Sequence, residues 1–142
     1  MAKVLIFSFY YYYYCSELTR PFDEDAIEKV LDIGCGPNLP WSIDFAASHP
    51  NAHVIGMDVL DKATDIIIDL PSNCELIKHN CIKPFPMEPN SIDLCHIRFM
   101  NTSFTMEQYK KVVENCWRVL KPGGYIEIME MDTLVYSPGP MT

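Results

Sequence analysis

Three kinds of ligand-binding group follow one another along the chain, each directly after a short apolar run. Gly34 and Gly36 stand one residue apart after the first run, Asp58 ends the second and Asn80 follows the third. Glycines let a backbone turn approach a ligand without a Cβ collision. A carboxylate can accept both hydroxyls of a ribose, and a side-chain amide can hydrogen-bond an adenine edge. Their order therefore predicts a site for a ligand that contains adenosine.

Each of these groups also has a purely structural interpretation. The glycines can serve a tight strand-to-helix turn, Asp58 can cap a loop, and Asn80 can be a turn residue. Their succession at neighbouring strand ends favours the ligand interpretation. A dinucleotide fingerprint would need a third glycine where the chain has Leu39, so nicotinamide or flavin binding is disfavoured.

The elements that position these groups alternate between strand and helix. Helices are expected over 41–48 and, after a T-x-x-Q capping box at Thr105 and Gln108, over 106–120, whereas 61–70 fits either state. The predicted strands cover residues 29–33, 53–57, 75–79, 91–98 and 125–131. Mostly apolar strands alternating with helices indicate an α/β fold with a parallel sheet covered on both faces. Ligands of such sheets bind beyond the carboxyl ends of the strands, beside the first strand.

Composition limits the class of protein. The 142 residues suit one domain, and the net charge of -8 without a basic cluster argues against a nucleic-acid partner. Six cysteines without a CxxC pair are typical of reduced, buried thiols and predict no metal site. No stretch approaches the roughly 20 apolar residues of a membrane helix, so we expect a cytoplasmic or nuclear protein.

Four segments together resemble the successive motifs of class I S-adenosylmethionine-dependent methyltransferases. They are Val30–Gly36, Val54–Asp58, Asn90–Arg98 and Trp117–Glu127. The resemblance runs over about three-quarters of the chain, from Ile27 to Asp132. It is greatest to the fungal methyltransferases related to the velvet-complex regulator of secondary metabolism. It implies a Rossmann-like, doubly wound, mostly parallel sheet and S-adenosylmethionine as the cofactor.

The resemblance also implies a role for individual residues. Asp32 and the glycine turn would flank the methionine end of S-adenosylmethionine, and Asp58 would hold its ribose. Arg98 would approach the methyl group of the cofactor and the methyl acceptor. The implied cofactor-binding residues are Asp32, Gly34, Cys35, Gly36, Asp58, Val59, Asn80, Cys81 and Arg98. Asn80 and Cys81 would line the adenine. No catalytic base is identified, because His96 and Arg98 have structural interpretations and positioning with water exclusion can supply much of the rate.

The chain departs from the family pattern in three places. Asn38 replaces a loop glycine, and the connection through Leu39 to Trp41 is longer, which would displace the methionine end. Residues 1–26, with a tract of five tyrosines, replace the family's leading helices; we expect a low-complexity or irregular segment, or an added strand or helix, before the partial methyltransferase domain at 27–142. The sheet is expected to be truncated after its fifth strand, leaving a flank that a protein partner could cover.

Two hypotheses of function follow. The first is methyl transfer from S-adenosylmethionine to a small-molecule or protein acceptor. The alternative is a catalytically inactive methyltransferase-like remnant that acts as a protein-interaction module. Binding of S-adenosylmethionine by the folded chain distinguishes them.

Overall fold

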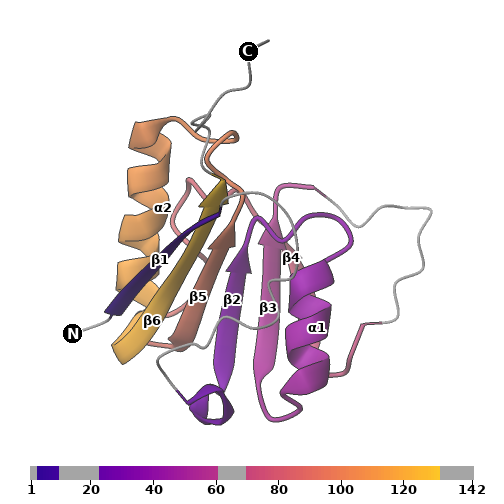
Figure 1. Cartoon of the computed structure of the whole chain (residues 1–142). Helices are drawn as coiled ribbons and strands as arrows, with labels where there is room; N and C mark the ends of the chain where they lie inside the picture. The colour runs from indigo at the N-terminus through magenta and orange to yellow at the C-terminus, as the bar shows by residue number, and fades with distance from the viewer. Residues whose placement is uncertain (1–2, 10–22, 61–69, 132–142) are drawn as a thin grey trace, which may run out of the picture.

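One parallel sheet organises the molecule (Figure 1). The computed structural model describes residues 3–9, 23–60 and 70–131. In this part of the chain the sheet has six strands in the order β1-β6-β5-β2-β3-β4, and all neighbours pair in parallel. The strands are β1 (Lys3–Phe9), β2 (Lys29–Ile33), β3 (His53–Asp58), β4 (Cys74–Lys78), β5 (Ile92–Arg98) and β6 (Leu120–Met131). The five strands predicted from the sequence are confirmed.

Among the described residues, two α-helices cover opposite faces of the sheet, as the alternation along the strands requires. Val30 packs in one core cluster with Phe45 of the first helix, whereas the next residue, Leu31, packs in the other cluster with Cys116 of the second. Successive strand side chains point to opposite faces, so the two clusters lie on the two sides of the sheet. The helices are α1 (Pro40–Ser48) and α2 (Met106–Val119), and a 3-10 helix, η1 (Glu24–Ala26), precedes β2.

The second helix starts where its capping box predicts. The Thr105 hydroxyl accepts a hydrogen bond from the Gln108 backbone N–H, and the Gln108 side chain accepts one from the Thr105 N–H. Val112, Cys116 and Val119 are the buried residues of α2, spaced so that one stripe faces the sheet. Local sequence therefore determines both the start and the orientation of this helix.

The beginning of β6 differs from the expectation. The Lys121–Gly124 segment was expected to separate the helix from a strand at Tyr125, but the strand begins at Leu120, directly after the helix. Leu120 pairs with Ile92 and Tyr125 with Leu94, so the β6 side carries extra residues between these two pairs. A bulge of this kind needs unusual backbone angles, and Gly123 supplies a φ of 91°.

The flank of β6 that was expected to stay open is paired by the chain itself. β1 runs parallel to β6 from the Lys3–Tyr125 pair to the Phe9–Met131 pair. Lys3–Phe9 thus forms a strand, one of the alternatives left open for the N-terminal residues, and it pairs with β6 along this length. The tyrosine tract, the ambiguous segment 61–69 and residues 132–142 lie outside the described residues.

Two expectations from composition can be compared with the described residues. Cys35, Cys74, Cys81, Cys95 and Cys116 are all buried, and these five form no disulfide. Packing rather than cross-linking therefore accounts for these five cysteines. Neither α1 nor α2 is long and apolar enough to cross a lipid bilayer.

Candidate functional site

The turn after β2 leaves its backbone open at Gly36. The chain reverses through Gly34 and Gly36 with φ values of 73° and 72°, in the left-handed region that glycine adopts without strain. The turn is held against β3 because the Gly34 N–H donates to the Met57 carbonyl oxygen at 2.8 Å. A Cβ added at Gly36 would meet no heavy atom within 4 Å. A ligand can therefore lie directly against the backbone there.

Asp58 at the end of β3 turns its carboxylate toward this backbone. Oδ2 accepts a hydrogen bond from the Gly36 N–H at 3.0 Å, and Oδ1 accepts one from the Leu60 N–H at 2.9 Å. A carboxylate offers about four acceptor sites, so two remain for a ligand. The carboxylate and the bare turn, which the sequence places 22 residues apart, thus meet at one point.

Gly34 has a second reason to be glycine. A Cβ there would overlap the sulfur of Met100, which lies over the turn. We expect Gly34→Ala to lower the free energy of unfolding by about 2–3 kcal/mol, roughly 1 from the left-handed backbone and the rest from overpacking. In a Met100→Ala background the same substitution should cost only about 1 kcal/mol. Urea unfolding of the four proteins measures both values, and an equal cost in the two backgrounds would contradict this role of Met100.

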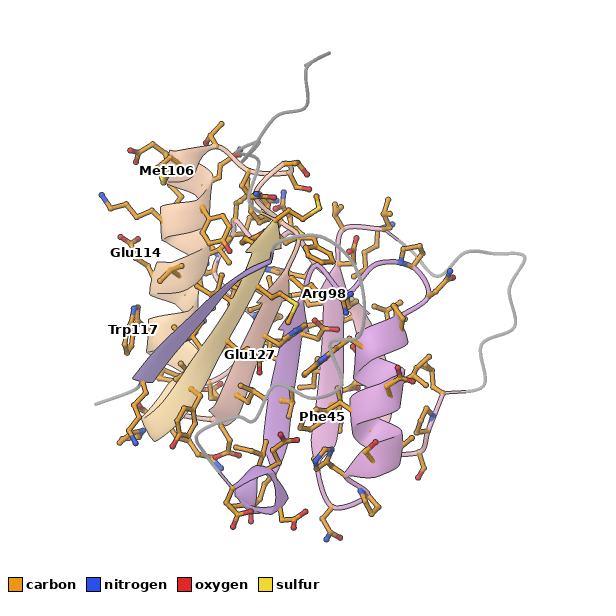
Figure 2. All side chains as sticks on the ribbon, in the orientation of Figure 1. Phe45, Arg98, Met106, Glu114, Trp117 and Glu127 are labelled. Carbon is orange, nitrogen blue, oxygen red and sulfur yellow. The ribbon has the colours of Figure 1, made fainter. Side chains whose placement is uncertain are left out.

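A pocket of about 300 Å³ lies on the β5 side of the turn. Four of the predicted residues line it: Asp32, Gly34, Cys35 and Arg98. Trp41, His96 and Phe99 contribute further side chains. Arg98 lies near the carboxyl ends of the strands, the edge where the sheet was expected to bind its ligand (Figure 2).

The departures at Asn38 and Leu39 do not fill this pocket. Leu39 precedes α1 with a φ of 46°, and its side chain is fully buried against Gly56 in the core beneath α1. Asn38 is exposed, and neither residue lines the pocket. The longer connection is therefore absorbed by turning Leu39 into the core, at the cost of a left-handed backbone that is unfavourable for leucine.

Asp32 and His96 form a buried pair at the base of the pocket. They are register neighbours on β2 and β5, and Asp32 Oδ1 lies 2.9 Å from His96 Nδ1. The other carboxylate oxygen accepts a hydrogen bond from the Ser42 hydroxyl at 2.6 Å, which ties the start of α1 to the sheet. The indole of Trp41 stacks on the imidazole with centroids 3.7 Å apart. Both residues stand out in the sequence, but their pairing was not predicted, although alignment of the two predicted strand ends could have suggested it.

A partly buried carboxylate on β6 holds the loop that follows β5. Glu130 Oε1 accepts hydrogen bonds from the Met100 N–H at 3.1 Å and the Tyr109 hydroxyl at 2.6 Å, and Oε2 accepts one from the Asn101 N–H at 3.1 Å. Burial, followed by the bond to Glu130, raises the pKa of Tyr109 well above its ordinary value. Glu130 therefore positions Met100 over the glycine turn. Sequence reasoning missed this residue because nothing local marks it.

The other predicted residues lie in different surroundings. Asn80 is half-buried beyond β4, and its side-chain oxygen accepts a bond from the Ile82 N–H at 3.1 Å, as in a turn. Val59 is exposed next to Asp58. Cys81 packs into the core on the α2 face, where burial raises the pKa of its thiol to about 11. Burial and the carboxylates of Asp32 and Asp58 also raise the pKa of Cys35. Both thiols thus stay protonated and unsuited to nucleophilic chemistry at neutral pH.

Comparison with known proteins identifies the family. A family model described as a methyltransferase domain matches residues 30–124, which contain the glycine turn, Asp58 and the Asp32–His96 pair. The chain belongs to this methyltransferase domain family. The matched residues include β3, β4 and β5, all of β2 except Lys29, and most of the site.

Three curated relatives of the methyltransferase domain are fungal proteins. The chain is 31% identical over 114 residues to methyltransferase str3 of Strobilurus tenacellus (80% of this chain, 39% of the relative). It is 32% identical over 106 residues to the secondary metabolism regulator LAE1 of Cochliobolus heterostrophus (73% and 33%). It is 31% identical over 121 residues to the tRNA N(3)-methylcytidine methyltransferase trm140 of Schizosaccharomyces pombe (78% and 39%). The chain thus spans well under half the length of these relatives.

Solved methyltransferases share the fold of the domain. A SAM-dependent methyltransferase from Aquifex aeolicus superposes with a TM-score of 0.60 at 23% identity, covering 82% of this chain and 65% of that one. Human N-acetylserotonin methyltransferase, solved in complex with SAM, superposes with a TM-score of 0.62 at 16% identity. This superposition covers 75% of this chain and 30% of the human one. The predicted Rossmann-like α/β architecture is confirmed.

Proposed function

We propose that this methyltransferase domain binds S-adenosylmethionine across the carboxyl ends of β5, β2 and β3 and directs its methyl group to an acceptor. One observation carries the proposal: the Asp58 carboxylate is hydrogen-bonded to the Gly36 N–H at 3.0 Å, at a turn whose outer side is open. A purely structural turn would not need a carboxylate with free acceptor sites beside bare backbone.

Across the sheet from β3 to β5, the described residues suit successive parts of this cofactor. The two remaining acceptor sites of Asp58 suit the ribose diol, and Asn80 lies beyond the neighbouring strand for the adenine. The open backbone at Gly36 leads to the pocket lined by Asp32, Gly34 and Arg98, which would take the methionine end. When bound there, the cofactor supplies an electrophilic methyl group on a positively charged sulfonium.

The chain's own contribution is positioning and exclusion of water. Asp58 and the turn orient one end of the ligand, and the buried Asp32–His96 pair forms a rigid wall at the other. Phe99 lines the same pocket, and Met100 covers the turn. Apolar side chains around a reacting centre exclude water, which strengthens the electrostatic interactions there. A fixed geometry lowers the entropic part of the activation barrier.

A small molecule or a protein is the acceptor class that we propose. The names of the relatives do not agree on an acceptor, because one denotes a tRNA methyltransferase and another a regulator of secondary metabolism. The net charge of -8 opposes contact with polyphosphate, which argues against nucleic acid. The buried cysteines of the described residues that form no disulfide suit a reducing compartment, so the cytoplasm or nucleus is the location that we propose.

Isothermal calorimetry with S-adenosylhomocysteine tests the proposal on the wild-type chain. We expect saturable binding that NAD does not compete, since Leu39 takes the place of the glycine that a dinucleotide site requires. Circular dichroism of the same sample provides the control for folding. If the folded protein binds no S-adenosylhomocysteine, the proposal fails and the inactive-remnant hypothesis replaces it.

A further inference from the structure

His96 carries a buried polar atom without a partner. Its relative exposure is 0%, and Nε2 has no hydrogen-bond partner. Buried polar atoms in native proteins are nearly always hydrogen-bonded, because leaving one unpaired costs the desolvation of that group. An unpaired atom in the wall of a pocket therefore indicates a contact that a ligand completes.

The hydrogen bond at the opposite ring nitrogen determines what Nε2 can do. Nδ1 lies 2.9 Å from Asp32 Oδ1, and Asp32 also accepts from Ser42, so Asp32 acts as an acceptor on both oxygens. Nδ1 then carries the proton, and in the neutral imidazole Nε2 is left as an acceptor. The complementary ligand group is an N–H or O–H donor.

The surroundings favour a cationic donor. In the strand register, His96 stands between Asp32 on β2 and Glu127 on β6, and both of these acidic residues are at most 3% exposed. Figure 2 shows Glu127 on β6 below the level of Arg98. Beside a neutral imidazole, two buried acidic groups favour a positively charged group of the ligand over a neutral one. Arg98, which lines the same pocket, offers a cation to an anionic group.

The position of the pocket identifies which end of the ligand brings this donor. Asp58 lies on β3, on one side of the glycine turn, whereas His96 lies on β5, on the other side. A ligand whose ribose is held by Asp58 therefore extends its far end toward His96. In S-adenosylmethionine the far end is an α-amino acid, with one ammonium and one carboxylate.

We propose that His96 is a specificity-determining residue whose Nε2 accepts a hydrogen bond from the α-ammonium of the cofactor's amino-acid end, with Asp32 holding the imidazole in the required tautomer. The inference rests on the proposed function and adds to it a residue that recognises the ammonium. It also explains why a histidine, rather than an apolar residue, occupies a fully buried strand position.

Two probes separate the amino-acid end from the rest of the ligand. S-adenosylhomocysteine contains it, and 5′-methylthioadenosine lacks it. His96→Asn retains a side-chain N–H where Nδ1 donates to Asp32 but has no atom at the place of Nε2. His96→Gln retains an acceptor near Nε2. By calorimetry we expect His96→Asn to lower the affinity for S-adenosylhomocysteine about tenfold or more. The affinity for 5′-methylthioadenosine should fall by less than about twofold. His96→Gln should recover part of the loss, which a merely structural role of His96 would not produce.

The matched control is His53→Asn. His53 is an exposed histidine at the start of β3, whereas the pocket lies toward the carboxyl ends of the strands. It should change neither affinity. If wild type binds both probes and His96→Asn keeps its full affinity for S-adenosylhomocysteine, the inference is wrong while the proposed function stands. If wild type binds neither probe, both fail.

Nitrogen-15 NMR of the histidines tests the inference without a substitution. The chain has four histidines, so the His96 signals can be assigned by comparison with His96→Gln. In the free protein we expect a protonated Nδ1 and an unprotonated Nε2. Saturating S-adenosylhomocysteine should shift the Nε2 resonance, and 5′-methylthioadenosine should leave it in place. An Nε2 signal that is protonated in the free protein, or that does not move with S-adenosylhomocysteine, would overturn the inference.

Discussion

Replacing Asp58 with alanine should weaken binding of S-adenosylhomocysteine at least about 100-fold. The substitution removes both oxygens that would accept the ribose hydroxyls, and hydrogen bonds to a charged group contribute about 1.5–3 kcal/mol each, where 1.4 kcal/mol is tenfold in affinity. It also frees the Gly36 and Leu60 N–H groups, which lie where water can replace the carboxylate because Asp58 is only half-buried and Leu60 is exposed. Calorimetry on the folded variant measures the loss.

Two further variants define the result for Asp58. Asp58→Asn keeps one acceptor oxygen, so its loss of affinity should be intermediate. Asp44→Ala removes an exposed carboxylate from α1 and should bind like wild type. Wild-type affinity in Asp58→Ala would mean that the carboxylate only caps the loop after β3, and the proposed cofactor site would be wrong.

Asp32→Ala should lower the free energy of unfolding by about 3–5 kcal/mol, the cost of removing one partner from a buried pair. It leaves His96 Nδ1 and the Ser42 hydroxyl without the carboxylate that both contact, and all three residues are at most 3% exposed. Small domains are stable by only about 5–15 kcal/mol, so this single change should remove a large part of the total. Urea unfolding with linear extrapolation measures the difference.

Ser42→Ala provides the comparison for Asp32. It removes one hydrogen bond but leaves the Asp32–His96 contact, so we expect it to lower the free energy of unfolding by about 1 kcal/mol. Asp32→Asn keeps the side-chain volume and one acceptor oxygen. Its loss of unfolding free energy should therefore lie between those of Ser42→Ala and Asp32→Ala. A loss for Asp32→Ala no larger than that for Ser42→Ala would show that the carboxylate does not hold β2, β5 and α1 together.

The Asp58 and Asp32 variants address different properties of one site. Asp58 lies at the open end of the turn and is available to a ligand, whereas Asp32 is buried at the junction of β2, β5 and α1. The same junction forms the wall of the pocket. The proposed ligand recognition would therefore use side chains that already stabilise the fold, which would keep the site ordered before a ligand arrives.

Local signals were enough to predict most of the elements. Short apolar runs such as 29–33 and 53–58 become buried parallel strands because both faces of the sheet are covered. The capping box at Thr105 identifies the start of α2 because its hydrogen bonds join residues three positions apart. Asp58 and the glycine turn could be placed together because parallel strands end at the same edge.

Longer-range packing explains the differences. Leu39 was expected to disturb the site, but the core beneath α1 accepts its side chain. Lys121–Gly124 was expected to separate the helix from the strand, but pairing with β5 extends the strand through a bulge. In each case a neighbour distant in the sequence decided the conformation, which propensities for single residues do not report.

The sequence by itself determined the succession of strands and helices, the bare turn at Gly34 and Gly36, and the acid that follows the next strand, because each depends on neighbours a few residues away. Only the tertiary structure decided that β1 pairs with β6, that Glu130 holds the loop at Met100, and that Asp32 meets His96 across 64 residues. These contacts depend on strand order and register, and both are set by packing of the whole sheet against α1 and α2.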